Sequence, residues 1–190
     1  AIELYSQTTL TTGSLSDAGT NGGFIDIWVN ISGASGGLTV GGTGSTTSYI
    51  NGSITATGAS SSRNGLLIQN GTANSVGDIT PLNSSGINVA NTAAQAGSIW
   101  INANQGTITL PSGTLSVNGS GSQPAGGIDL LASTITAASG ATLSATQSTS
   151  APQASHAIVL AATTVNFGGS SGFKANANGN YGQVVVLPAG

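Results

Sequence analysis

Residues Gly97–Leu110 read GSIWINANQGTITL, and this stretch contains the pattern that predicts the fold. Ile99 and Ile101 are apolar and enclose one variable residue, which is the alternation of a β-strand with one buried face. After a short segment rich in turn-forming residues, Thr107–Leu110 shows the same alternation. Short alternating runs between glycine-containing turns favour β-structure over helix.

The apolar–variable–apolar triplet recurs along the whole chain. The first positions of successive triplets lie between 23 and 41 residues apart. Apart from the longest interval, these spacings lie within the range of periods found in repeat folds. The longest interval, from Ile25 to Leu66, is expected to contain a loop. The seven triplets are Ile2–Leu4, Ile25–Ile27, Leu66–Ile68, Ile99–Ile101, Ile128–Leu130, Ile158–Leu160 and Val184–Val186.

Further alternating runs lie between the triplets, for example Leu38–Val40, Ile54–Ala56 and Ile135–Ala137. Two or three short strands per period, with turns between them, correspond to one coil of a β-solenoid. We therefore predict an all-β parallel β-helix of about seven coils, in a single domain over residues 1–190. The alternative is a β-sandwich of the pilin type, which also has short strands and turns. The recurrence near 30 residues favours the β-helix.

The composition excludes several classes of function. Only 4% of residues are charged, the formal net charge is -3, and Lys and Arg together number 2, so the chain offers no basic surface for nucleic acid. It has no Cys and no Met, which agrees with a secreted, extracellular protein. The longest apolar run, Ala157–Ala162, is far shorter than the ~20 residues that cross a bilayer, so we predict no membrane span.

The segments Gly97–Asn104, Gly106–Leu110 and Gly113–Val117, followed by Gly126–Ala145, resemble coils of filamentous-haemagglutinin-type bacterial adhesins. The resemblance covers Gly22–Gly190 and rests on composition as much as on motifs. It implies an exported, right-handed β-helix exposed at the bacterial cell surface. The secretion domain of that family is not recognisable in these residues, and the sequence begins without Met. We therefore expect either a fragment or a small subunit that polymerises.

Few residues could carry chemistry. If the triplets align, Asp26 and Asp129 lie three coils apart, about 14 Å, which exceeds the roughly 5 to 9.5 Å between paired carboxylates of glycosidases. Glu3 and Asp26 would lie on adjacent coils, about 5 Å apart. That spacing fits a carboxylate pair or a shared calcium ion, but two solvated carboxylates are the favoured interpretation.

We therefore predict no catalytic residues, no metal and no cofactor, so the protein is not expected to be an enzyme. A polysaccharide lyase or hydrolase is the weakest alternative. His156 is interpreted as an exposed turn residue because it has no sequence-adjacent nucleophile or metal partner. Arg63 is interpreted as a solvated loop charge, with contact to a polyanion as the alternative.

Two tryptophans are candidate binding residues. Trp28 and Trp100 point outward if the isoleucines of their triplets point inward. Outward tryptophans stack on sugars or anchor a protein partner, so a carbohydrate-binding module that contacts surface glycans is an alternative function. The competing interpretation is that a loop of the long second interval covers both rings.

Both ends of the repeat array are apolar. The first triplet contains Ile2 and Leu4, and the last strand contains Val184, Val185, Val186 and Leu187, with no recognisable cap at either end. An uncapped coil leaves backbone groups and apolar side chains unpaired. We therefore predict end-to-end stacking of copies, or neighbouring coils of a longer chain, and expect Val185→Lys to prevent stacking. The expected function is a structural or adhesive role in a cell-surface fibre.

Overall fold

The structure is a computed structural model of the 190-residue chain. It is nearly all β with almost no helix, and every pairing between named strands is parallel. A β-sandwich requires antiparallel sheets, so the alternative β-sandwich prediction is not supported by this pairing. The described residues are 1–18, 23–42, 46–57, 65–83, 86–89, 96–119, 123–147, 157–177 and 183–188.

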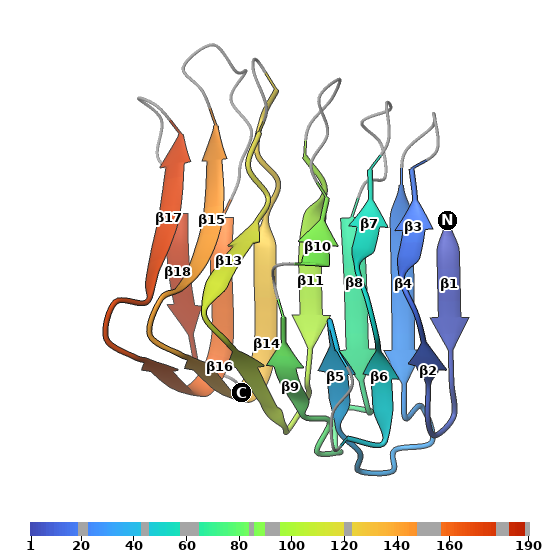
Figure 1. Cartoon of the computed structure of the whole chain (residues 1–190). Coiled ribbons are helices and arrows are strands. Elements are labelled where there is room, and N and C mark those ends of the chain that lie inside the picture. The colour runs from blue at the N-terminus through green and yellow to red at the C-terminus, as the bar shows by residue number, and fades with distance from the viewer. Residues whose placement is uncertain are drawn as a thin grey trace.

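The seven triplets lie side by side in one row of parallel strands (Figure 1). Their register aligns the first position of each triplet with the first position of the next, so Ile25 pairs with Ile2 on one side and with Leu66 on the other. This confirms the predicted alignment. The row consists of β1 (Ile2–Tyr5), β4 (Phe24–Val29), β8 (Gly65–Asn70), β11 (Ser98–Asn102), β14 (Ile128–Ala137), β16 (Ala157–Phe167) and β18 (Gln183–Leu187).

Between successive strands of this first row, the chain contributes strands to two further rows. The second row curls away from the first and contains, in spatial order, β2 (Thr11–Thr12), β6 (Ser48–Ile50), β5 (Leu38–Val40), β9 (Ile79–Leu82) and β12 (Thr107–Leu110), then the later residues of β14 and β16. The third row contains the remaining strands. These are β3 (Leu15–Asp17), β7 (Ile54–Ala56) and β10 (Ile87–Asn88), and then β13 (Gly113–Ser116), β15 (Ala141–Gln147) and β17 (Gly172–Ala177).

The long second interval contains an additional strand. Both β5 and β6 lie between Ile25 and Leu66, and they pair with each other in parallel. β5 also pairs with β9, whereas β6 also pairs with β2. The sequence predicted a loop in this interval. The described part of the interval instead adds one extra strand to the second row.

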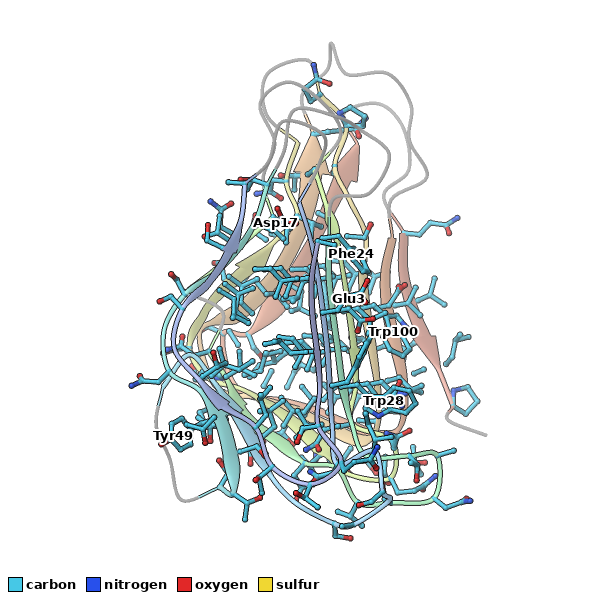
Figure 2. All side chains as sticks on the ribbon, turned by 90° about the vertical axis from the view of Figure 1, so that its right-hand side faces the viewer. Glu3, Asp17, Phe24, Trp28, Tyr49 and Trp100 are labelled. Atoms are coloured by element: carbon cyan, nitrogen blue, oxygen red, sulfur yellow. The ribbon has the colours of Figure 1, made fainter. Side chains whose placement is uncertain are left out.

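The core consists of the inward residues of every row. In β4 the burial alternates strictly, with Ile25, Ile27 and Val29 completely buried, as expected for a strand with one face in the core. Figure 2 views the molecule from the end nearest β1 and shows side chains filling the space between the rows. Each buried Ile or Leu contributes roughly 1.5–3 kcal/mol relative to exposure, which explains why the triplets are apolar at both inward positions.

Glycines before the triplets allow close approach of neighbouring backbones. A Cβ atom at Gly65 would lie 2.7 Å from the backbone oxygen of Ser98, and one at Gly23 would lie 2.1 Å from that of Asp17. Any larger residue would force these strands apart. The glycines at these two positions therefore have a steric cause.

Buried asparagines hold the corner between the first and second rows. Asn70 is completely buried at the end of β8, and its Nδ2 donates to the carbonyls of Gly36 and Asp78, both at 2.8 Å. Its Oδ1 accepts from Asn30 Nδ2 at 2.7 Å, and its carbonyl accepts from Asn104 Nδ2 at 2.8 Å. Asn70 thus connects three successive corner segments.

Within the described residues, no helix is long and apolar enough to cross a lipid bilayer.

Candidate functional site

An open groove of about 520 Å³ lies on the outer face of the first row. Figure 2 shows Trp28 and Trp100 on the same side of this row, with Glu3 on that side as well, whereas Tyr49 of β6 lies on the opposite side of the molecule. The groove is lined by Tyr5 of β1, Asp26 and Trp28 of β4, Ile31 just after β4, Leu67 and Gln69 of β8, and Trp100 of β11.

Strand alternation and register bring the two tryptophans together. Ile25, Ile27, Ile99 and Ile101 are buried, and strand alternation places Trp28 and Trp100 on the outer face, where both line the groove. Trp28 lies opposite Gln69, and Trp100 lies opposite Leu67. The two tryptophans are two strands and two residues apart, so their Cα atoms lie roughly 12 Å from each other at ordinary strand spacing and rise.

Two groove side chains are fixed by one backbone carbonyl. Trp28 Nε1 donates to Gly71 O at 2.9 Å, and Gln69 Nε2 donates to the same oxygen at 3.2 Å. Gly71 has φ of 81°, a backbone conformation that favours glycine. The turn after β8 therefore holds the Trp28 ring and the Gln69 amide in place beside the groove.

Tyr5 and Asp26 form a hydrogen-bonded pair at one end of the groove. The Tyr5 hydroxyl donates to Asp26 Oδ2 at 2.7 Å. This bond, together with the nearby negative charges, raises the pKa of Tyr5 to about 12, because ionisation would place a phenolate beside a carboxylate. Asp26 Oδ1 is buried and has no hydrogen-bond partner among the described residues.

Acidic side chains lie in one column of the same outer face, where a column means the positions that are aligned in register across neighbouring strands. Glu3 pairs with Asp26 in register, and Asp129 pairs with Trp100. The predicted adjacency of Glu3 and Asp26 is thus confirmed, as is the separation of Asp26 from Asp129 by three strands. Asp129 is exposed at the surface, but neighbouring residues partly desolvate its carboxylate, and this raises its pKa. The described residues contain no group of three His, Asp or Glu side chains arranged to hold a metal.

The inward columns of the first row are exposed only where the row ends. In the column that starts at Ile2, the five middle members from Ile25 to Ile158 are 0–2% exposed, whereas Val184 of β18 is 41% exposed. In the neighbouring column, Leu160 is completely buried and Val186 is 56% exposed. Ile2 and Leu4 of β1 are partly buried. Among the described strands, β1 pairs only with β4, and β18 pairs only with β16.

The structure adds residues to the candidate site that the sequence analysis missed. Trp28 and Trp100 were predicted to face outward, but Tyr5, Leu67 and Gln69 were not considered as partners. Tyr5 directly follows the first triplet, just as Trp28 directly follows the second. The same alignment that paired Glu3 with Asp26 could therefore have placed Tyr5 beside Trp28.

The covering loop proposed as an alternative is not observed over the tryptophans within the described residues. Both rings line the groove, and Ile31 alone among the lining residues lies in the long interval beyond β4. Arg63 and His156 lie outside the described residues, so their interpretation as loop and turn residues stays a prediction.

Comparisons with known proteins add no family: no protein-family model matches the sequence, and neither the curated proteins nor the solved structures that were compared yield a match.

Proposed function

We propose that the chain is a parallel β-helix, right-handed like the adhesins it resembles, that serves as a structural element of a bacterial cell-surface fibre. The alignment of seven triplets in one row supports the β-helical interpretation. So does the order in which the chain repeatedly contributes strands to successive rows. A stack of this kind extends by adding coils, which is how a fibre grows.

The exposed inward positions of β18 carry this proposal. Val184 and Val186 continue two columns that are otherwise buried in the middle strands, yet they are 41% and 56% exposed. Exposed apolar side chains next to an unpaired strand edge favour the addition of a further parallel strand. A second copy of the chain supplies such a strand through its β1.

The register predicts how the two copies meet. If β1 of the next copy continues the row, Val184 faces Ile2 and Val186 faces Leu4, so both columns become continuous. Val185 then lies on the outer face opposite Glu3, as the equivalent residues do within the row. A lysine at Val185 would therefore be tolerated, and Val186 is the correct position for a disruptive charge. This replaces the earlier expectation for Val185→Lys.

We also propose a secreted location and no enzymatic activity. The absence of Cys and the low charge support an extracellular structural protein. Asp26 is hydrogen-bonded to Tyr5, and it lies three strands from Asp129, about 14 Å at ordinary strand spacing. The Asp26–Asp129 separation is too long for a catalytic carboxylate pair, and although Glu3 lies opposite Asp26, the Tyr5 hydroxyl already occupies Asp26 Oδ2. Turnover of any polyuronate would favour the lyase or hydrolase alternative.

The test is negative-stain electron microscopy of the native material together with intact mass spectrometry. Filaments built from a 190-residue species are expected, and Val186→Lys should abolish them, because the charge would lie inside the continuous core. Val185→Lys is the matched control and should leave filaments intact. Discrete monomers of the 190-residue species would contradict stacking of copies, and a larger mass would assign the neighbouring coils to the same polypeptide.

A further inference from the structure

We propose that the groove formed by Tyr5, Trp28, Leu67, Gln69 and Trp100 binds an uncharged oligosaccharide of at least two pyranose rings. The groove lies on the outer face of the first row, whereas the fibre proposal rests on the edges of β1 and β18. The two proposals share only Tyr5 of β1, whereas Trp28 and Trp100 lie on β4 and β11, away from the stacking edges, so either proposal can fail without the other.

The size and lining of the groove fit a small organic ligand. Its volume of about 520 Å³ falls within the range of roughly 300–1,000 Å³ that is typical of ligand sites. Aromatic and aliphatic side chains form most of its surface, with few polar groups among them. Such a surface matches the apolar faces of sugar rings, while the polar groups orient the ring hydroxyls.

The aromatic side chains form an extended platform and not a cage. With Cα atoms roughly 12 Å apart, Trp28 and Trp100 can each contact a different ring of one elongated ligand. A single small cation requires ring faces within about 6 Å of one point, which this separation disfavours. The hydrogen bond from Trp28 Nε1 to Gly71 O holds that ring in place before a ligand arrives, so little rotamer entropy is lost on binding.

Asp26 offers an acceptor that the protein leaves unused. Its Oδ2 accepts from Tyr5, but its Oδ1 is buried without a partner among the described residues. An unsatisfied buried carboxylate oxygen is costly. A sugar hydroxyl is a neutral donor that can satisfy this oxygen.

The charges around the groove exclude acidic glycans. Glu3, Asp26 and Asp129 lie in one outer column with Leu67 and Trp100. Among the described residues, no Lys or Arg side chain lines the groove. A polyuronate or sulfated glycan would bring further negative charge to this column and be repelled. An uncharged saccharide avoids that repulsion and uses the same hydroxyl contacts.

Intrinsic tryptophan fluorescence tests the proposal directly, because the only two tryptophans of the chain, Trp28 and Trp100, both line the groove. The purified protein is titrated with neutral hexasaccharides of the gluco, xylo, manno and N-acetylglucosamine series. At least one should produce a saturable change in fluorescence. Polygalacturonate, heparin and choline should produce none.

Variants then locate the binding site by isothermal titration calorimetry. Trp28→Ala and Trp100→Ala should each weaken binding by about tenfold or more, while Trp28→Phe, which keeps an aromatic face, should weaken it less. Tyr49→Ala removes an aromatic side chain from the opposite side of the molecule and should leave affinity unchanged. Circular dichroism verifies that each variant is folded.

Four results would overturn the proposal. The first is that no neutral saccharide produces a saturable change in fluorescence, and the second is that saccharide affinity survives the loss of both tryptophans. The third is that the protein binds choline or a polyanion in preference to a neutral saccharide. The fourth is that the fluorescence change is caused by self-association through the groove. Analytical ultracentrifugation during the titration identifies the last of these.

Discussion

On strands β4, β8 and β11, the inward side chains are nearly identical, whereas the outward side chains differ in every strand. Inward, each strand presents two large aliphatic residues of its triplet, all buried to 2% exposure or less. Outward, the same strands present Asp26 and Trp28, then Leu67 and Gln69, then Trp100. The core requires the same shape at every level, because each layer packs on the next.

The outer face has no such requirement. Its residues meet water, so each position is free to differ and can be used for binding. The groove occurs where three different outward patterns lie next to one another. The repeated inner face therefore specifies the fold, and the unrepeated outer face is the place to look for ligand recognition.

The largest effect expected from this difference is on stability. Ile68→Ala removes a completely buried side chain from the inner face of β8 and should lower the free energy of unfolding by about 2–5 kcal/mol. Leu67→Ala, the adjacent residue on the outer face, should cost less than about 1 kcal/mol. Urea-induced unfolding followed by circular dichroism measures both. Equal losses would show that the two faces do not differ as described.

A smaller effect is expected at the corner that joins the first two rows. Asn70→Ala removes the side-chain donor to Gly36 O and Asp78 O and the acceptor for Asn30. Leaving such buried groups unsatisfied should cost roughly 1–3 kcal/mol.

Asn51→Ala is the matched control for the corner, because this asparagine also precedes a glycine but is exposed. The same unfolding measurement should place it within about 0.5 kcal/mol of the unaltered protein. A loss at Asn51 as large as that at Asn70 would contradict a special role for the buried amide.

The smallest effect concerns the outer face alone. Tyr5 should titrate with a pKa of about 12, in contrast to an ordinary tyrosine near 10, because Asp26 accepts its hydroxyl proton. The raised pKa means that the folded state holds the proton more tightly. Its contribution to stability is therefore complete below about pH 10 and is lost as the pH rises through about 12.

Ultraviolet absorbance of the tyrosinate form monitors this titration, with Tyr5→Phe identifying the signal that belongs to Tyr5. Asp26→Asn should move the midpoint back toward 10, since the negative acceptor is removed. A Tyr5 midpoint that is insensitive to this substitution would show that the pair is not formed in solution.

Much of the first row could be predicted from the sequence. The apolar triplets predicted which residues are buried, which strands are adjacent and which side of β4 and β11 carries a tryptophan. Those predictions succeeded because an inward residue must contact its equivalents above and below, so the pattern repeats in the sequence. Asn70 gave no such signal, because its hydrogen-bond partners lie on segments that are distant in the sequence.

The strand β6 was also missed. Leu38–Val40 was recognised as a strand-like run, but Ser48–Ile50 has only one strongly apolar residue and its pairing with β5 could not be predicted. β5 and β6 occupy neighbouring positions in the second row, and both bury residues in the core.

The sequence by itself determined which face of each strand is inside, because successive side chains of an extended chain alternate regardless of context. Only the tertiary structure decided which outward residues meet. Hydrogen bonding between parallel strands sets Tyr5 beside Trp28 and Trp100 beside Leu67, and the turn at Gly71 fixes the Trp28 ring. Those contacts join residues from four strands, and they exist only after these strands have paired.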